Sequence, residues 1–537
     1  MKKKRRNPQL PKDDLAAAPS WPYLPLLILT ALCVCIAIMR LHTYNEPFER
    51  DITSHAVIAH EMLAGRQLYS DLWDSKPPAI FVTYATADIL VGYGPLQVYF
   101  IGVMAAIVTL LGIYRAGSAQ GGAAGGLWAA AFWAFICSDM YLWANQPNIE
   151  VCINACLAWA FALILRTDEQ KLQPGRWLAI GGLFALATFY KPVAITFAGL
   201  LAVFHILTRL HQAEARKIAF LQVGIAAAIG AAAWAAVAGY FAATDRLTTF
   251  YQTVFQYGSY YTKSRGGSIL KNILEGFSYK RFFAQAMKST KVLAIFATAG
   301  AVFGLWKGRR RYWLLLIGFA LAAHIAVALP GRFYRHYYQL WLGPLVIGTG
   351  WAIATFGPKG KPYPALARHT AGAIGMIILL SSVLPQYKFS ADEWSAKKIN
   401  PQFVVSRRVV TEVDRLLRPG ETLYVWGQNP EFYFWAKRRP PTGLIWSTDL
   451  MDNPLAEEHT ARALADLKRE KPEIFVVNIL QFKVPLNHPV IRWALQNYVP
   501  LPENPNRGLL YGRAFLFRVF IRRDGRLASQ FRLQGPG

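Results

Sequence analysis

The main pattern along the chain is a series of long apolar runs separated by short polar segments. A helix needs about 20 mostly apolar residues to cross the hydrocarbon core of a bilayer. Eleven runs approach that length: 22–40, 95–114, 122–139, 150–166, 177–191, 192–208, 218–243, 289–306, 312–329, 338–357 and 369–386. The pattern predicts an α-helical polytopic membrane protein with about eleven transmembrane helices.

Two places along this pattern need a separate interpretation. The run 78–93 is shorter, contains Asp88 and is interrupted near its end by Gly92, so we expect a re-entrant or interfacial segment packed against the bundle. The runs 177–191 and 192–208 are separated only by the Lys191–Pro192 step, which predicts a tight pair of helices.

The charges between the runs predict the orientation. The basic start of the chain precedes an apolar run that has no small-residue cleavage site after it, so we expect an uncleaved first span with a cytoplasmic N-terminus. With alternating sides, every loop assigned to the cytoplasm is basic, as the positive-inside rule requires. These loops carry Arg115, Arg166, Lys171, Arg176, Arg209, Arg216, Lys217, Lys307, Arg309, Arg310, Arg311, Lys359, Lys361 and Arg368.

The same topology predicts the domain organisation. Residues 1–21 form a basic cytoplasmic N-terminus, residues 22–386 a transmembrane domain with a first external loop at 41–94, and residues 387–537 an extracytoplasmic soluble domain. In the last part, 422–426 and 473–478 are typical of strands, 457–470 of a helix and 512–520 of a late strand. We therefore expect a small C-terminal α/β domain.

Composition narrows the class of protein further. Apolar residues make up 54% of the 537 residues and charged residues only 17%, against about 25% charge in a typical soluble protein. This excludes a disordered chain, a coiled coil and a compact cytosolic enzyme. The formal net charge of +27 is explained by the cytoplasmic loops, so no nucleic-acid partner is expected.

The first external loop holds the most informative polar residues. Residues 52–63 have helical periodicity and Gly65 fits a helix stop, which places Asp51 just before a helix. Taken alone, Asp51 is typical of an N-cap, and Asp71, Asp74 and Lys76 of solvated loop charges.

The spacing of this loop resembles the first external loop of GT-C glycosyltransferases. The closer similarity is to the bacterial branch of the protein mannosyltransferase and aminoarabinose transferase superfamily, which is family 39-like. The matching positions are Asp51, Ala59, Gly65, Tyr69, Asp71, Trp73, Lys76, Pro77 and Pro78. Three later segments, in the correct order, are also similar to parts of that family: 182–192 to one of its spans, 330–338 to its late external loop, and 422–440 to the C-terminal domains of many bacterial members.

The resemblance implies transfer of a sugar from a polyprenyl-phosphate donor to an extracytoplasmic acceptor hydroxyl, with inversion, at a bacterial inner (plasma) membrane. Asp51 falls on the position of the family's general base, which accepts the acceptor's proton. The family commonly has Asp-Glu here, whereas Ile52 follows Asp51 in this chain, and Glu49 stands two residues earlier.

The remaining candidates would bind substrate. Glu150 heads the fourth run, where a helix-start acid is the plain alternative. Cations facing the outer leaflet could hold the lipid phosphate or anchor lipid headgroups, and Tyr334 fits a sugar contact or an aromatic belt. The full set is Glu150, Lys76, Asp71, Lys191, Arg332, Arg335, His336 and Tyr334.

Several alternatives remain open at this stage. A transporter or lipid flippase would explain the spans and intramembrane charges but not the loop spacing, and a non-catalytic GT-C-like scaffold is compatible with Ile52. The donor sugar could be mannose, glucose or an arabinose-type pentose, and the acceptor a cell-envelope glycan, a lipid or a protein. Membrane lipids are the other expected partner. No cofactor or metal is assigned, because the chain has no clear DxD pair; a divalent ion is used by some GT-C enzymes only.

Overall fold

The computed structural model describes residues 23–263, 268–306, 310–355, 365–479, 484–502 and 516–532. The predicted basic N-terminus, 1–21, and the basic loop residues Lys307, Arg309, Lys359 and Lys361 lie outside the described residues.

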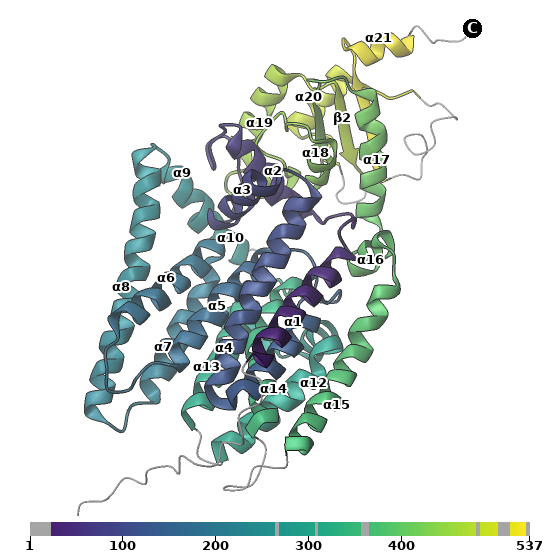
Figure 1. Ribbon diagram of the computed structural model, residues 1–537. Helices are drawn as coiled ribbons and strands as arrows, with labels where there is room; N and C mark the ends of the chain where they lie inside the picture. Colours follow the sequence, from purple (N-terminus) through teal and green to yellow (C-terminus); the bar gives the residue numbers. More distant parts are fainter. Residues whose placement is uncertain are drawn as a thin grey trace, which may run out of the picture.

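A bundle of long helices carries a small soluble domain at one end (Figure 1). The bundle consists of α1 (Leu24–Leu41), α4 (Pro95–Ile136), α5 (Ile149–Leu165), α6 (Pro174–Tyr190), α7 (Ile195–Leu207), α8 (Ala213–Ala243), α12 (Tyr279–Trp306), α13 (Arg310–Ala328), α14 (Leu342–Thr355) and α15 (Ala365–Val383).

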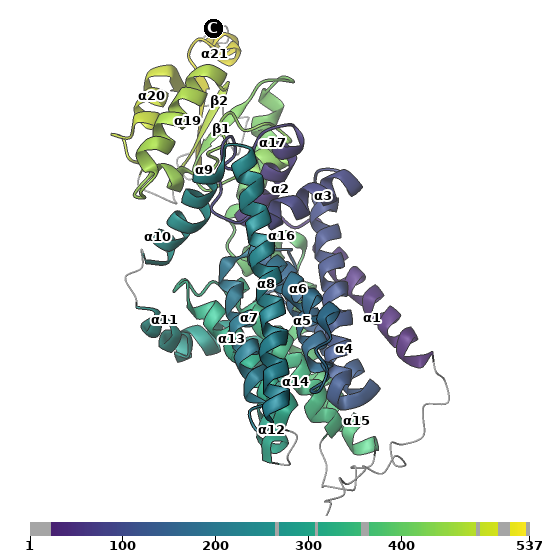
Figure 2. The ribbon, with the colours of Figure 1, turned by 90° about the vertical axis from the view of Figure 1, so that its left-hand side faces the viewer.

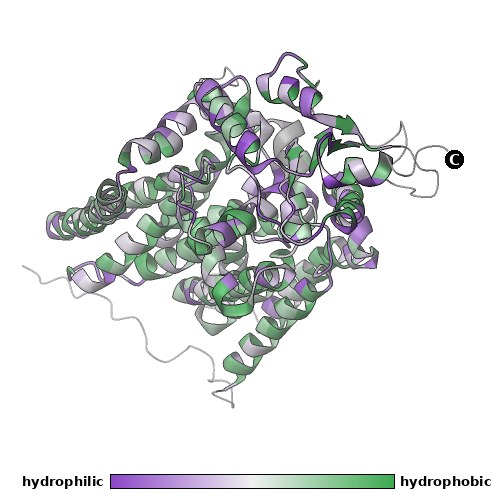
Figure 3. Cartoon of the chain, turned by 90° about the horizontal axis from the view of Figure 1, so that it is seen from above, coloured by the Kyte–Doolittle hydropathy of each residue, from purple (hydrophilic) through white to green (hydrophobic). Residues whose placement is uncertain are grey.

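Membrane spans follow from length and composition. Among the described residues, six helical segments are long and apolar enough to cross a membrane, namely Leu24–Leu41, Pro95–Ile136, Ala213–Ala243, Met287–Trp306, Arg310–Ala328 and Leu366–Lys388. Large apolar side chains such as Ile38, Val302 and Ile377 stay exposed on these helices, as expected for a surface that faces lipid. Seen from above, the bundle helices are mostly hydrophobic, and hydrophilic residues gather in the loops and the soluble domain (Figure 3). The protein is a polytopic membrane protein, and the total of eleven spans stays a prediction.

Helix α4 is two antiparallel arms. The chain reverses at Gly122, whose φ of 58° and ψ of −163° favour glycine. The Trp133 indole donates to the Ala106 carbonyl at 2.9 Å, across 27 sequence positions, which requires the arms to lie side by side. The arms correspond to the predicted runs 95–114 and 122–139.

The two irregular segments also take defined forms. Lys191 is extended between α6 and the short 3₁₀ helix η1 (Pro192–Ala194), so the predicted break at Lys191–Pro192 is confirmed. Helix α3 (Ala79–Val91) has 13 residues, or about 20 Å, which is too short for a bilayer core of about 30 Å. Its apolar Ile89 and Leu90 are exposed, as in an interfacial segment.

The C-terminal domain is α/β, as predicted. A four-stranded sheet of order β1-β2-β4-β3 contains β1 (Leu423–Trp426), β2 (Ile474–Asn478), β4 (Phe517–Arg522) and β3 (Tyr498–Pro500). Strands β1 and β2 are parallel and fully buried, and β4 runs antiparallel to β2. The predicted late strand is found at 517–522; residues 512–515 lie outside the described residues. The helices are α16 (Ala391–Lys398), α17 (Gln402–Leu416), α18 (Glu431–Ala436), η5 (Ser447–Leu450), α19 (Ala456–Glu470), α20 (Pro489–Asn497) and α21 (Arg526–Arg532).

Several loop elements lie between the bundle and this domain (Figure 2). They include α2 (Arg50–Leu63) and α3 from the first loop, and α9 (Leu247–Tyr251) and α10 (Tyr257–Lys263) from the segment after α8. The Tyr260 hydroxyl donates to the Asp452 carbonyl, and the Trp73 and Tyr257 rings meet edge to face at 4.9 Å. The loops and the soluble domain therefore form one continuous cap over one end of the bundle.

Candidate active site

Asp51 lies in the first turn of α2 and is not its N-cap, which is Glu49. A carboxylate in a first helical turn is stabilised by the helix dipole. The side chain is 26% exposed, so it can reach a substrate. The N-cap alternative for Asp51 is therefore wrong in this structure.

Lys76 lies between two carboxylates. Its ammonium nitrogen is 3.0 Å from Oδ1 of Asp74 and 3.9 Å from Oδ1 of Asp51. Burial alone would raise the pKa of Asp51, but the positive charge of Lys76, with further contributions from the neighbouring His336, His55 and Arg50 side chains, outweighs it and lowers the pKa. Asp51 is thus held ionised, with a cation beside it.

The soluble domain contributes to the same group through Trp446. Its indole donates to the Ser54 hydroxyl at 3.2 Å, and Ser54 donates to Oδ2 of Asp74 at 3.2 Å. The Lys76 ammonium lies 5.8 Å from the centre of the Trp446 ring, at the outer limit of a cation–π contact. The hydrogen bonds that run from Trp446 through Ser54 and Asp74 to Lys76 hold the lysine beside Asp51.

A second charged pair comes from α5 and the break after α6. The buried Glu150 carboxylate accepts from Lys191 Nζ at 2.9 Å, and the same ammonium lies 3.4 Å from the centre of the Tyr337 ring. Asn148 caps α5 and also donates to Oε1 of Glu49 at 2.9 Å, so its amide serves the first loop. Glu150 is more than a helix-start acid, because it holds Lys191 in place.

His336 links the two pairs. It belongs to η3 (Arg335–Trp341) and interacts electrostatically with Asp51 and Glu150. Burial lowers its pKa, although the two carboxylates act in the opposite direction. Its ring stacks on Tyr334 at 5.7 Å, which places Tyr334 at the exposed edge of the group.

The two late arginines lie at the border of this group. Arg332 donates to the Tyr261 carbonyl at 3.0 Å and lies 4.1 Å above the Tyr261 ring. Arg335 donates to the Lys398 carbonyl at 3.4 Å. Both arginines therefore connect the late external loop to neighbouring elements of the cap.

Asp71 stands apart from the other candidates. Its side chain is exposed, and its Oδ2 accepts a hydrogen bond from the backbone N–H of Gln67 at 2.8 Å, which closes a turn of the first loop. Its charge faces Arg462 of the soluble domain. The structure does not bring Asp71 together with Asp51, whereas it does bring together Lys76, Glu150, Lys191 and His336.

A buried polar network supports the start of the first loop. Glu46, which is fully buried, pairs with Lys398 of α16 and accepts from the Asn145 amide. Arg40, at the end of α1, donates to the Asn145 carbonyl at 2.7 Å. These contacts tie the first loop, the second loop and the soluble domain together directly before Asp51.

No protein-family model and no curated protein matches the sequence. Solved structures do match. The aminoarabinose transferase-type protein ArnT from Cupriavidus metallidurans, bound to undecaprenyl phosphate, aligns with a TM-score of 0.60 and 15% identity over 94% of this chain and 99% of that chain. The Archaeoglobus fulgidus oligosaccharyltransferase, in complex with Zn and sulfate, aligns with a TM-score of 0.54 and 14% identity over 89% and 72% of the two chains. The chain has the GT-C fold.

Within this GT-C fold, sequence reasoning did not select four residues that the structure places in or beside the site: His55, Glu46, Lys398 and Trp446. His55 lies one turn after Asp51 on α2, is buried, and has no hydrogen bond from either ring nitrogen to any described residue. Burial lowers the pKa of His55 well below its ordinary value. The four-residue spacing of His55 from Asp51 places both on the same face of α2 and could have indicated His55 from the sequence. The positions of Lys398 and Trp446 depend on how the soluble domain packs on the bundle, and no local sequence pattern indicates that packing.

Among the described residues, no group of three or more His, Cys, Asp or Glu side chains is placed to hold a metal ion. What the arrangement offers chemically is an ionised, partly exposed carboxylate next to fixed cations. Such a pair can accept a proton at one point and stabilise an anionic leaving group at another.

Proposed function

We propose that the protein is a membrane glycosyltransferase that moves a sugar from a polyprenyl-phosphate donor to an extracytoplasmic acceptor hydroxyl, inverting the anomeric carbon. The observation that carries the proposal is the position of Asp51. A partly exposed carboxylate lies 3.9 Å from Lys76, in a group that also includes Glu150, Lys191 and His336.

Asp51 would act as the general base. The acceptor oxygen attacks the anomeric carbon, its proton passes to an Asp51 carboxylate oxygen, and the bond from that carbon to the phosphate oxygen breaks. The products are a glycoside and polyprenyl phosphate. Because Lys76 keeps Asp51 ionised, the base is available at neutral pH.

The cations would hold the donor phosphate. The leaving group gains negative charge as the bond breaks, and fixed ammonium or guanidinium groups stabilise that charge without transferring a proton. Lys76 and Lys191 lie nearest to the two carboxylates, and Arg332 and Arg335 lie on the late loop. The ArnT structure that shares this fold is bound to undecaprenyl phosphate, which supports a lipid-phosphate donor.

The proposed location is a bacterial inner membrane, with the N-terminus in the cytoplasm and the soluble domain outside. The basic residues of the alternating loops support this orientation. A lipid-linked donor suits such a site, because its isoprenoid tail remains in the bilayer while its phosphate reaches the cap.

The test is a transfer assay with purified full-length protein and a panel of polyprenyl-phosphate sugars. The wild type is compared with Asp51→Asn and with Glu412→Gln, a surface carboxylate of α17 that bonds Arg415. We expect Asp51→Asn to lower transfer by about 10²–10⁴-fold and Glu412→Gln to leave it unchanged. Equal transfer by all three proteins would defeat the role of Asp51, and lipid flipping without transfer would favour a flippase.

A further inference from the structure

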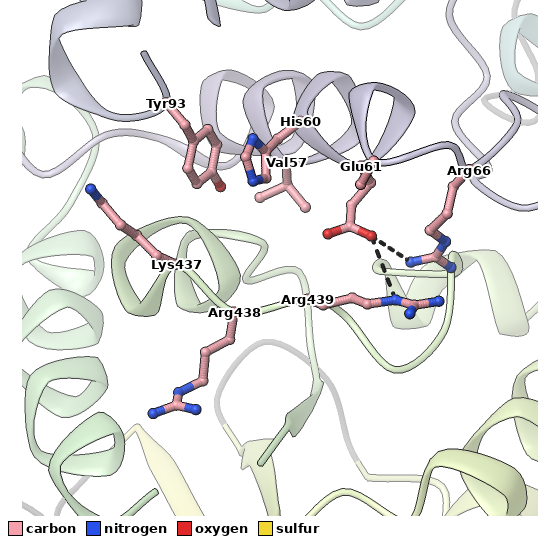
Figure 4. A pocket seen from close by; sticks show the side chains of 9 residues that line it. Val57, His60, Glu61, Arg66, Tyr93, Lys437, Arg438 and Arg439 are labelled. Carbon is pink, nitrogen blue, oxygen red and sulfur yellow. Dashed lines mark hydrogen bonds and ion pairs between the residues drawn. The ribbon is translucent and has the colours of Figure 1, made fainter. Parts of the chain in front are cut away.

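Two groups of cationic side chains lie outside the candidate active site, and they differ in how their charge is balanced. In a pocket of about 300 Å³ between α2 and α18, Arg66 and Arg439 both lie against the Glu61 carboxylate, at 3.2 and 3.7 Å (Figure 4). These two arginines therefore have their counter-charge within the protein. The second group has no such counter-charge among the described residues.

The second group consists of Arg115, Arg166 and Arg176, which we call the arginine cluster. Arg115 lies in the first arm of α4, Arg166 caps the C-terminal end of α5, and Arg176 lies in the first turn of α6. Because α5 starts beside the candidate active site with Glu150, Arg166 lies about 24 Å further along the helix, at 1.5 Å per residue. The arginine cluster is therefore at the end of the bundle away from the cap.

Hydrogen bonds connect the three arginines to one another. Nη2 of Arg166 donates to the Arg115 carbonyl at 3.1 Å. Nη1 of Arg176 donates to the Arg166 carbonyl and, at 2.8 Å, to Oε1 of Gln173. The positive charges are thus held close together, and those of Arg115 and Arg176 disfavour the charge of Arg166. An anion bound among them would offset this repulsion.

The nearby carboxylates are engaged elsewhere. Glu169, in the loop between α5 and α6, pairs with Arg311 at 2.9 Å, and Asp168 accepts from the backbone N–H of Gln170 at 2.8 Å. No described carboxylate forms an ion pair with a member of the arginine cluster. A guanidinium has five N–H donors, and its planar fork matches the oxygens of a phosphate group. The arginine cluster therefore has the charge and the donors to hold a phosphate.

An apolar surface leads away from the arginine cluster along two helices. On α4, the exposed Met104 and Val108 precede Arg115 with helical spacing, so all three lie on one face. On α5, the half-buried Trp159 precedes Arg166 by seven residues and shares its face. The Trp159 indole donates to the Val108 carbonyl at 2.9 Å, which joins the two faces. Basic side chains at the end of such a surface match a lipid with an anionic headgroup.

We propose that the arginine cluster binds the phosphate headgroup of an anionic phospholipid, whose acyl chains lie along the exposed faces of α4 and α5. In the proposed orientation this end of the bundle faces the cytoplasm, the side on which basic pockets between transmembrane helices bind anionic headgroups. The lipid site is far from Asp51, so it stands or falls separately from the proposed transfer reaction.

The test measures lipid binding to purified full-length protein in detergent by native mass spectrometry, together with the unfolding temperature. The probes are phosphatidylglycerol and cardiolipin, with phosphatidylcholine and inorganic phosphate as references. The variants are Arg115→Gln and Arg115→Gln/Arg166→Gln. The matched control is Arg216→Gln/Lys217→Gln, which removes two exposed cations from the start of α8 at the same end of the bundle.

The Arg115 side chain bonds no described residue, so Arg115→Gln without lipid should unfold at the wild-type temperature or above it. Bound lipid should raise the unfolding temperature of the wild type. We expect the wild type, the control and Asp51→Asn to bind at least one anionic lipid equally well. Arg115→Gln should bind it about fivefold more weakly, and the double variant about 25-fold more weakly.

Three results would overturn the inference. The first is wild-type protein that binds phosphatidylcholine as well as it binds both anionic lipids, or that responds equally to inorganic phosphate. The second is binding by the double variant that equals that of the wild type, or an equal loss in the Arg216→Gln/Lys217→Gln control. The third is loss of lipid binding in Asp51→Asn, because it would assign the lipid to the candidate active site.

Discussion

The ammonium nitrogen of Lys76 lies 3.9 Å from Oδ1 of Asp51, and the positive charge of Lys76 favours the ionised form of this proposed base. Lys76 lowers the pKa of Asp51 against the effect of burial. A base must be deprotonated to act, so wild-type transfer should persist at mildly acidic pH and fall only as the pH drops through that lowered pKa.

Lys76→Met should therefore move the acid limb of the pH profile to higher pH, because the pKa of Asp51 rises when the cation is removed. The measurement is kcat/KM against pH, with Lys468→Met of α19 as the control lysine. Superimposable acid limbs in the wild type and Lys76→Met would contradict the assigned influence of Lys76.

The Glu150–Lys191 pair should show strong coupling in stability. Glu150 is 1% exposed, so Lys191→Met alone leaves an unpaired buried carboxylate and should cost about 3–5 kcal/mol. Glu150→Gln/Lys191→Met removes both charges and should recover most of that loss without restoring transfer. Thermal unfolding in detergent is measured for four proteins: the wild type, Glu150→Gln, Lys191→Met and the double variant. Simple additivity of the two single changes would refute the coupling.

Trp446 should influence transfer from the soluble domain. Trp446→Phe keeps an aromatic ring but removes the N–H that bonds Ser54 at 3.2 Å. The loss of one hydrogen bond, about 1 kcal/mol, predicts a fall in kcat/KM of about fivefold. The control is Trp493→Phe, whose ring packs on Tyr498 in the same domain. Comparable effects of the two changes would indicate general destabilisation of the domain.

Glu49 should make the protein less stable as the pH rises. Burial, with a further contribution from Asp51, raises the pKa of Glu49 above its ordinary value. Between the ordinary and the raised pKa the folded chain holds a proton that the unfolded chain has lost, so the free energy of unfolding decreases with increasing pH. Glu49→Gln cannot ionise and should show a smaller decline in unfolding temperature between about pH 5 and pH 8, which is the interval between the ordinary pKa and the raised pKa of about 8. A steeper decline in the variant would contradict the raised pKa.

Much of the fold followed from the sequence because its signals are local. Apolar runs and the Lys191–Pro192 step located the helices and their break, and strand patterns located β1 and β2. Helix α4 is the instructive element. Its two arms are predicted as the separate apolar runs 95–114 and 122–139, and the structure adds the reversal at Gly122, which the hydropathy alone does not fix.

The candidate site was predictable only in part. The resemblance of the first loop to a family pattern pointed to Asp51 and Lys76, and these two residues do lie together. Asp71 fits the same family pattern but stabilises a turn, because its side chain accepts a hydrogen bond from the backbone N–H of Gln67. Trp446 reaches the site through contacts across nearly 400 positions of sequence, and such long-range docking leaves no periodicity to detect.

The buried pair of Glu46 and Lys398 has a consequence for how this protein can be engineered. Lys398 is 1% exposed and lies in the segment that leads into the soluble domain, yet its partner stands five residues before Asp51. A chain that ends before Lys398 would leave the Glu46 carboxylate buried without its cation at the start of the first loop. The soluble domain therefore supplies a buried counter-charge to the transmembrane part. A chimaera that exchanges this domain between relatives must carry Glu46 and Lys398 together.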